Sequence, residues 1–303
     1  MITYFDGGMG TMLNLKAGEL PELLNLSDPE RVYAVHKAYA EAGADIITAN
    51  TFGANRLKYD NADELIKAAV KNAKRTGKKV ALDIGPTGKL LKPMGDLDFE
   101  ECVDIFADVV KAGKDDADLV ICETFGDIYE LKAAMLAVKE NSDLPLIVSM
   151  IFDEKGRLLT GADVKTACAV AEGLGADVIG FNCGLGPEQM VPLVEELEKC
   201  CSTPIIVMPN AGLPESVDGK TVFNVDPEEF AGYMKQIAEM GVSVLGGCCG
   251  TTPAHIKAMI EATKDIPDRV PSFKTDTVVT SYSECVNISD IVVIGERINP
   301  TGK

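Results

Sequence analysis

Short apolar runs alternate with amphipathic stretches along almost the whole chain. Eight of these runs are rich in Val and Ile, and several are continuously apolar. Continuous apolar runs are typical of parallel strands that are buried on both faces. We therefore expect strands at ITYFD (2–6), ADIITAN (44–50), KVALDIG (79–85), DLVICET (118–124), PLIVSMIF (145–152), DVIGFNC (177–183), PIIVMPN (204–210) and VSVLGGC (242–248).

The stretches between these runs have the apolar spacing of helices. Many begin at Asp-Pro or a similar cap-then-Pro signal, and several end at a Gly just before the next strand. Eight strand–helix units predict an α/β fold, the (β/α)8 TIM barrel. A doubly wound sheet is the main alternative, but it usually has fewer units and carries a G-x-G-x-x-G signature that is missing here. The expected helices cover 28–43, 63–77, 99–113, 127–141, 164–175, 186–200, 226–241 and 252–264.

Composition narrows the class of protein. The chain has 303 residues, 46% hydrophobic and 25% charged, which is usual for a soluble globular protein. A net charge of −18 argues against a nucleic-acid partner. We find no signal peptide and no apolar stretch of about 20 residues, so we expect no membrane span. Nine cysteines without an export signal lead us to expect the reducing cytoplasm, where clustered cysteines favour metal binding.

Three cysteines fall at expected strand ends. In a (β/α)8 barrel the active site lies at the carboxyl ends of the strands, so Cys183 and the pair Cys248–Cys249 are expected on one rim. Three protein ligands with an open fourth position are the arrangement of catalytic zinc, and thiolates favour zinc over magnesium or calcium. The alternative is that they are three small residues in a crowded rim. We expect five other cysteines to be small buried hydrophobic residues, namely those at 102, 122, 168, 200 and 201.

Carboxylates also fall at strand ends. Asp6 precedes Gly7 and Gly8, which allow a close approach of backbone to a ligand. Glu123 ends an apolar strand and needs a cationic or hydrogen-bonding partner, for which a substrate ammonium would serve. Asp83 lies in a segment that also reads as a turn. The alternative is that these carboxylates have a structural role, as helix caps or as members of ion pairs.

The two histidines are expected on the outer helices, at positions 36 and 255, so few mechanisms based on histidine are open to this chain. An aldolase or lyase that uses Asp6, Asp83 and Glu123 with a divalent, oxygen-bound metal is an alternative function. It predicts magnesium or manganese instead of zinc. A non-enzymatic zinc module is a third, but no fourth cysteine or histidine falls at a strand end to close its site.

Five motifs give the chain a family resemblance. Together they resemble the zinc-dependent homocysteine S-methyltransferase family over about residues 1–265, in the right order. Within it, the chain is most similar to the homocysteine-binding domain of the cobalamin-dependent methionine synthases. The resemblance implies a (β/α)8 barrel. The motifs are DGGMGTML (6–13), TANTFGAN (48–55), CETF (122–125), GFNCGLGP (180–187) and GGCCGTTPAHI (246–256).

The resemblance also implies roles for individual residues. It implies that Zn²⁺ is held by Cys183, Cys248 and Cys249, the catalytic group. Homocysteine, held as a zinc-bound thiolate, then attacks a methyl group and becomes methionine. The residues implied to bind this substrate are Asp6, Gly7, Gly8, Thr51, Phe52 and Glu123.

The resemblance extends to the methyl donor and to the domains. It implies methylcobalamin as donor, recharged from methyltetrahydrofolate by other domains; the cobalamin-binding D-x-H-x-x-G is not found here. We expect a zinc barrel over 1–265, an interdomain linker over 266–290, and the truncated start of a pterin-binding domain over 291–303 (IVVIGERINPTGK). A stand-alone enzyme that uses S-methylmethionine or betaine is the alternative within the family.

Overall fold

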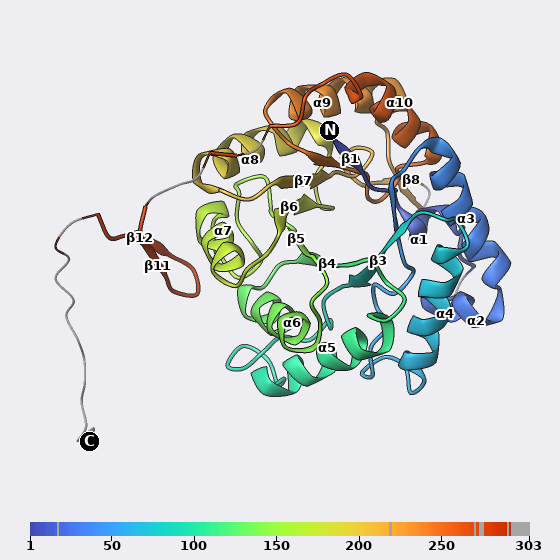
Figure 1. Ribbon diagram of the computed structural model, residues 1–303, viewed down its shortest axis with the longest axis horizontal. Helices are drawn as coiled ribbons and strands as arrows, with labels where there is room; N and C mark the ends of the chain where they lie inside the picture. The colour runs from blue at the N-terminus through green and yellow to red at the C-terminus, as the bar shows by residue number, and fades with distance from the viewer. Residues whose placement is uncertain (17, 218–219, 270, 273–275, 290, 292–303) are drawn as a thin grey trace.

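The computed structural model describes residues 1–16, 18–217, 220–269, 271–272, 276–289 and 291. Eight parallel strands form a ring with helices around it (Figure 1). Their order in the sheet is β1-β10-β7-β6-β5-β4-β3-β2, and a parallel bridge between Phe5 and Ile46 joins the first strand to the last. The predicted (β/α)8 barrel is therefore confirmed. The strands are β1 (Thr3–Tyr4), β2 (Ile46–Thr48), β3 (Lys79–Ile84), β4 (Leu119–Phe125), β5 (Leu146–Met150), β6 (Val178–Asn182), β7 (Ile205–Met208) and β10 (Val244–Leu245).

The eight expected helices also form, and their ends follow the capping residues. Asp28, Asp127, Asp163 and Asp226 each accept a hydrogen bond from a backbone N–H of the first turn, which satisfies a donor that has no partner inside the helix. Pro occupies the first turn of α3, α8, α9 and α10, where no N–H is needed. The helices are α3 (Pro29–Ala42), α4 (Ala62–Lys74), α5 (Phe99–Gly113), α6 (Ile128–Asn141), α7 (Val164–Gly173), α8 (Pro187–Cys200), α9 (Pro227–Glu239) and α10 (Pro253–Thr263).

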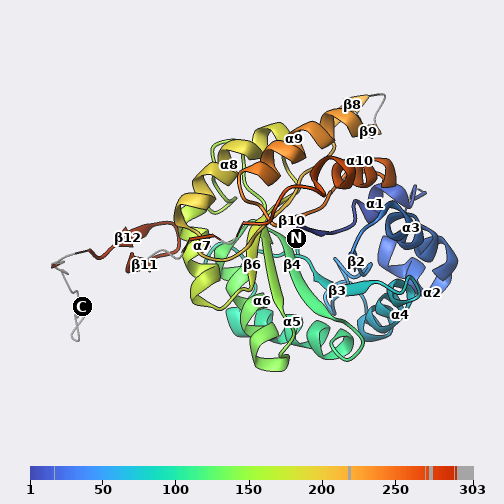
Figure 2. The same cartoon turned by 45° about the horizontal axis from the view of Figure 1, so that its top comes forward.

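Several short elements were not expected. The loop after β1 contains α1 (Met9–Met12), the 3-10 turn η1 (Pro21–Leu23) and α2 (Leu24–Ser27). A hairpin of β8 (Glu215–Val217) and β9 (Lys220–Val222) follows β7, and Figure 2 shows it beyond the ring of strands, near α9 and α10. Three-residue strands carry too little periodicity to be recognised in a sequence.

The segment expected to be an interdomain linker, 266–290, contains another hairpin. Its strands are β11 (Val278–Thr280) and β12 (Cys285–Asn287), and it contacts α7 on the outside of the barrel (Figure 1). The expected start of a pterin-binding domain, 291–303, lies outside the described residues except for Ile291.

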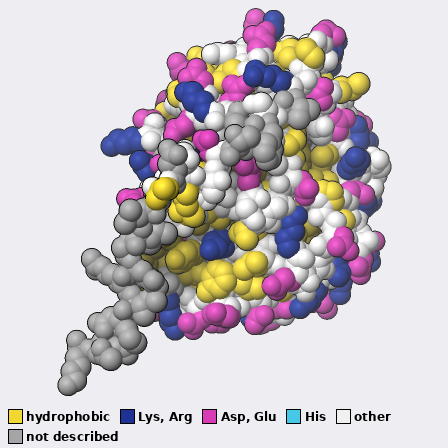
Figure 3. All heavy atoms as spheres, turned by 60° about the vertical axis from the view of Figure 1, so that its left-hand side comes forward, with side chains coloured by type: hydrophobic (Ala, Val, Ile, Leu, Met, Phe, Trp, Pro, Cys, Tyr) yellow, Lys and Arg dark blue, Asp and Glu magenta, His cyan; other side chains and the backbone are white. Residues whose placement is uncertain are grey.

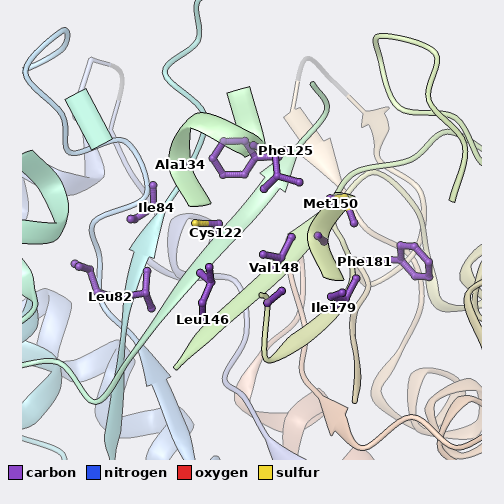
Figure 4. Packing of buried hydrophobic residues seen from close by; sticks show 14 of the residues in the cluster. Leu82, Ile84, Cys122, Phe125, Ala134, Leu146, Val148, Met150, Ile179 and Phe181 are labelled. Atoms are coloured by element: carbon purple, nitrogen blue, oxygen red, sulfur yellow. The ribbon is translucent and has the colours of Figure 1, made fainter. Parts of the chain in front are cut away.

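The core has two parts, as in other barrels of this type. Inside the ring, side chains from alternate strand positions, among them Phe5, Ile121 and Ile206, fill the barrel. Between the ring and the helices lies a larger cluster, part of which is seen in Figure 4, where Leu82, Cys122 and Val148 project from neighbouring strands. Because the strands are buried on both faces, their sequences are continuously apolar.

The two histidines lie on outer helices, as predicted, and both side chains are buried. His36 is 0% exposed and neither ring nitrogen has a hydrogen-bond partner among the described residues. Burial lowers the pKa of His36 to about 3. The His255 ring accepts from the backbone N–H of Thr252 at 3.2 Å, and its other nitrogen lies 3.0 Å from the carbonyl oxygen of Val225. His255 thus caps the start of α10.

None of the described helices has the length and apolar character that a membrane span requires. The surface on the side of α7 carries basic and acidic side chains with a patch of hydrophobic ones between them (Figure 3). Leu159 is 82% exposed, and among the exposed hydrophobic side chains of the described residues only Met1 and Ile291 are more so.

Candidate functional site

Three thiols meet at the carboxyl end of the barrel. Cys183 directly follows β6, and Cys248 and Cys249 lie in the loop between β10 and α10. The Sγ atoms of Cys183 and Cys249 are 3.9 Å apart, and all three Sγ atoms lie within 4.8 Å of one another. All three residues are half-buried. The sequence placed these thiols on one rim, and the structure brings them to metal-ligand spacing.

The backbone holds the thiols in place. Cys183 has φ of 56°, a left-handed conformation that is costly for a residue with a side chain and that is seen mainly where function requires it. Gly8 approaches the Cys248 carbonyl so closely that a Cβ there would lie 2.7 Å from its oxygen. The loop after β1 can therefore pass directly over the cysteine pair only because Gly8 has no side chain.

Two asparagines, Asn182 and Asn210, support the thiols. The Nδ2 of Asn182 donates to Thr124 Oγ1 at 2.7 Å and approaches Cys248 Sγ at 3.9 Å, while its Oδ1 accepts from Ser149 Oγ at 2.9 Å. Asn210 lies close enough to Cys183 to contribute to the lowered pKa of that thiol. Both asparagines fall inside expected strands, but nothing in a sequence shows which side chain lies beside a thiol.

The electrostatics of the three thiols favour one negative charge. Hydrogen bonds from the Cys248 and Cys249 thiols lower the pKa of Cys183 to about 3. Hydrogen bonding to Cys183 raises the pKa of Cys248 well above its usual range and that of Cys249 to about 12. The cluster thus concentrates negative charge, which a cation would neutralise.

The thiols open into a cavity of about 390 Å³ at the mouth of the barrel. Carboxylates, apolar side chains and backbone groups line it together with the thiols, as in many small-molecule sites. The lining residues that matter below are Asp6, Gly7, Gly8, Phe52, Asp83, Glu123, Met208 and the three cysteines.

Asp6 is fixed at the end of β1. Its two carboxylate oxygens accept hydrogen bonds from the backbone N–H of Thr48 at 3.0 Å and from the Thr48 hydroxyl at 2.7 Å. Burial nevertheless raises the pKa of Asp6 to about 7, which the hydrogen bonds from Thr48 only partly oppose. Asp6 is thus an oriented carboxyl that gains from a cation in the cavity.

Glu123 lies on an irregularity of β4. The pairing of β4 with β5 shifts register between Cys122 and Phe125, and Thr124 has φ of 64°. Such a bulge turns a side chain that regular alternation would place elsewhere, and Glu123 lines the cavity. Burial, followed by the charges of Cys183 and Asp6, raises the pKa of Glu123 to about 8. No hydrogen bond or ion pair to the Glu123 carboxyl occurs within the described part of the chain.

Asp83 is a third acidic group of the cavity. It is 4% exposed, and its Oδ1 has no hydrogen-bond partner among the described residues. Burial and then the charge of Glu123 raise the pKa of Asp83 well above its usual range. Three acidic groups without a cation are an unfavourable arrangement, so the site is built for a positively charged ligand group.

Of the two remaining residues expected to bind the substrate, Phe52 lies at the cavity and Thr51 does not. Phe52 lines the cavity and is 41% exposed. Thr51 is buried and does not line it. Its hydroxyl donates to the Asp83 carbonyl oxygen at 2.7 Å and accepts from the Asp83 N–H at 3.1 Å. Thr51 thereby joins the end of β2 to β3 and fixes the backbone of Asp83.

Glu22 is a cavity residue that the sequence analysis did not identify. It is 2% exposed and accepts from the Tyr59 hydroxyl at 2.7 Å and from the Gly53 N–H at 2.8 Å, with Lys58 Nζ at 3.2 Å. It comes from the irregular loop after β1, which carries no periodic signal. Because its charge is already paired with Lys58, Glu22 stabilises the loop and is not free to pair with a ligand.

The chain is similar in sequence to known proteins. A sequence model of the homocysteine S-methyltransferase family matches residues 3–263. Over 98% of its length the chain is 32% identical to the methionine synthase of Mycobacterium tuberculosis, and equally so to that of Mycobacterium leprae. The chain spans 28% of the length of these relatives.

Among solved structures, the fold is similar to that of the homocysteine methyltransferase MmuM from Escherichia coli in its metallated form. The TM-score is 0.73 at 22% identity, over 86% of this chain and 96% of that one. At this level of identity, the similarity shows only that the two proteins share the barrel fold.

Proposed function

Because the chain belongs to the homocysteine S-methyltransferase family, we propose that it binds homocysteine and positions its thiol for methylation to methionine. One observation carries the proposal. Three thiols and the carboxyl groups of Asp6, Asp83 and Glu123 line one cavity, at the end of the barrel where enzymes of this fold have their active sites. Homocysteine has a thiol at one end and an ammonium group at the other, and so matches both.

The three thiols fit a zinc ion. Their spacing within 4.8 Å suits ligands of one ion, and a set of three sulfur donors is typical of zinc with an open position. We propose that Cys183, Cys248 and Cys249 hold it. When bound, zinc would lower the pKa of the homocysteine thiol, whose usual value is about 8.5, and so supply a thiolate nucleophile at neutral pH.

The carboxyl groups of the cavity would orient the substrate. Glu123 has no protein partner among the described residues, and Asp6 is held by Thr48, so both can accept hydrogen bonds from the substrate ammonium. The Gly8 N–H already donates to Thr251 Oγ1 at 3.2 Å, so of this pair we propose the Gly7 backbone as the neighbour of the substrate carboxylate. Binding at both ends fixes the sulfur for in-line attack, which lowers the entropic part of the barrier.

The remaining walls would limit access of water. Phe52 and Met208 cover the cavity with apolar surface. Excluding water strengthens the hydrogen bonds of the carboxyl groups and keeps the thiolate poorly solvated. No protein group must move a proton during methyl transfer itself, which agrees with the placement of both histidines outside the cavity.

We propose methylcobalamin as the methyl donor, carried by a separate domain or protein and recharged from methyltetrahydrofolate elsewhere. The support is the match to methionine synthases over nearly the whole chain, of which this chain corresponds to about a quarter. We further propose that residues 266–290 connect the barrel to a pterin-binding domain that begins near 291. Nine free cysteines support a cytoplasmic setting.

The zinc content of cysteine variants tests the site. The variants Cys183→Ala, Cys248→Ala and Cys249→Ala should each lose zinc and all methionine formation, whereas Cys102→Ala, a buried cysteine of α5, should retain both. Full zinc content in any of the three would remove that residue from the site.

The donor is tested separately. The purified zinc-loaded chain is given homocysteine with methylcobalamin, S-methylmethionine or betaine, and methionine is measured. We expect methionine only with methylcobalamin. Turnover with either of the other donors would refute the cobalamin proposal while leaving homocysteine as acceptor. Incorporation of magnesium or manganese in place of zinc would instead favour a lyase or aldolase.

A further inference from the structure

A second cluster of thiols lies at the opposite end of the barrel. Cys168 and Glu172 are one turn apart on α7, and Cys201 lies in the loop between α8 and β7. One ligand atom of each, the two Sγ atoms and a carboxylate oxygen, lie within 4.8 Å of one another. Cys201 precedes β7, whereas the thiols of the active-site cavity follow their strands. The two clusters therefore cannot share an ion.

We propose that Cys168, Cys201 and Glu172 form a second metal site, which binds a thiophilic divalent cation such as Zn²⁺ or its analogue Cd²⁺. Cys200, adjacent to Cys201, lies outside this cluster, and its thiol donates to the carbonyl oxygens of Glu196 and Leu197. The proposal does not depend on homocysteine or on methyl transfer.

The arrangement of Glu172 supports a ligand role. Its Oε1 accepts hydrogen bonds from the N–H groups of Ser202 at 2.5 Å and Thr203 at 3.0 Å, and from the Thr203 hydroxyl at 2.8 Å. These bonds fix the position of the carboxylate beside Cys201. The ion pairs formed by the described residues do not include Glu172.

The thiols are also suited to a metal. Cys168 is 1% exposed and Cys201 is 0% exposed, so both are already desolvated, while Cys200 and Glu172 are half-buried and give access from solvent. Cys201 Sγ lies 3.6 Å from Glu172 Oε1.

The site's position indicates a structural role. A metal bound there would join α7 to the loop that leads into β7, at the amino end of the strands, where residues of this fold serve stability. The cation would therefore stabilise the fold and take no part in the reaction.

Cadmium binding tests the proposal without relying on the active site. The variant Cys183→Ala/Cys248→Ala/Cys249→Ala should still bind one Cd²⁺ per chain, with a thiolate-to-cadmium absorption band in the ultraviolet. Adding Cys168→Ser should abolish this binding. Adding Cys102→Ser, at a buried cysteine far along the chain in α5, should not. A triple variant that folds and binds no Cd²⁺ would overturn the proposal, and so would retained binding after Cys168→Ser.

The unmutated chain gives a second measurement, which is needed should the triple variant fail to fold. Two equivalents of ¹¹³Cd²⁺ should give two nuclear magnetic resonance signals, of which homocysteine shifts one and leaves the other. A single signal that homocysteine shifts would refute the second site and leave the proposed function intact. A single signal that homocysteine leaves unchanged would support the second site and contradict the proposed function.

Discussion

Replacing Glu123 by Gln removes a charge from the cavity and keeps the shape of the side chain. Glu123 lines the same cavity as the three thiols, and burial raises its pKa to about 8. An ammonium group of homocysteine beside it would favour the ionised carboxylate and release its proton. Glutamine can accept a hydrogen bond from that ammonium but offers it no opposite charge. We therefore expect Glu123→Gln to weaken homocysteine binding.

The expected size follows from the contact that is lost. A hydrogen bond to a charged group contributes roughly 1.5–3 kcal/mol, which corresponds to about ten- to a hundredfold in the dissociation constant. At pH 7 the wild-type carboxyl, with a pKa of about 8, must first ionise, at a cost of about 1.4 kcal/mol for one pH unit. The difference between wild type and Glu123→Gln should therefore grow between pH 7 and pH 8.

The assay is calorimetric titration of homocysteine into the zinc-loaded protein at both pH values. Mercaptoethanol, which has a thiol but no ammonium group, is the control ligand and should bind both proteins equally well. Zinc content should not change, since Glu123 is not a ligand in this arrangement. Equal affinity of the two proteins for homocysteine would show that the Glu123 carboxyl has a structural role. Loss of zinc in Glu123→Gln would show that Glu123 supports the metal site instead of the substrate.

Three further outcomes are expected. X-ray absorption at the zinc edge should show one additional sulfur ligand when homocysteine is added, with release of a proton; an unchanged ligand set would contradict the role of the open position. His36 has its pKa lowered to about 3 by burial, so the unfolded state binds the extra proton once pH falls below about 6.5. Stability should then fall, by about 2 kcal/mol at pH 5, and urea unfolding of His36→Leu should lack this loss. Because burial raises the pKa of Asp83, this carboxyl keeps its proton at neutral pH in the folded protein and loses it in the unfolded protein. Asp83→Asn should therefore raise the midpoint of thermal unfolding at pH 7.5, with the gain vanishing in acid; an unchanged midpoint at pH 7.5 would show that Asp83 has a partner.

The strands and helices of the barrel could be predicted because their patterns are local. Strands such as β3 and β5 are buried on both faces and read as continuous apolar runs, and the helices begin at Asp caps and proline. The meeting of Cys183 with Cys248 and Cys249 could also be predicted, although they are far apart in the chain. Carboxyl ends of parallel strands share one rim, so the strand assignment alone brings such residues together. That they bind zinc remains a prediction.

Other parts of the site could not be predicted, because they depend on small deviations from regular structure. The irregularity of β4 beside Glu123 and the positive φ of Cys183 are set by contacts with neighbouring strands and loops. The support of Cys248 by Asn182 depends on a side-chain direction that has no signature in the sequence. The same holds for Thr51, whose hydroxyl serves the Asp83 backbone and not the cavity.

What the sequence by itself determined is therefore the fold and the edge of the barrel at which its polar residues gather, since hydrophobic periodicity and chain order suffice for both. Only the tertiary structure decided burial and distance. His36, on an outer helix, is buried, and Cys168 and Cys201 lie with Glu172 in a cluster although they appeared as separate buried residues. The pKa shifts of Asp6, Asp83 and Glu123 likewise arise from desolvation and from neighbouring charges, which depend on distances between residues remote in sequence.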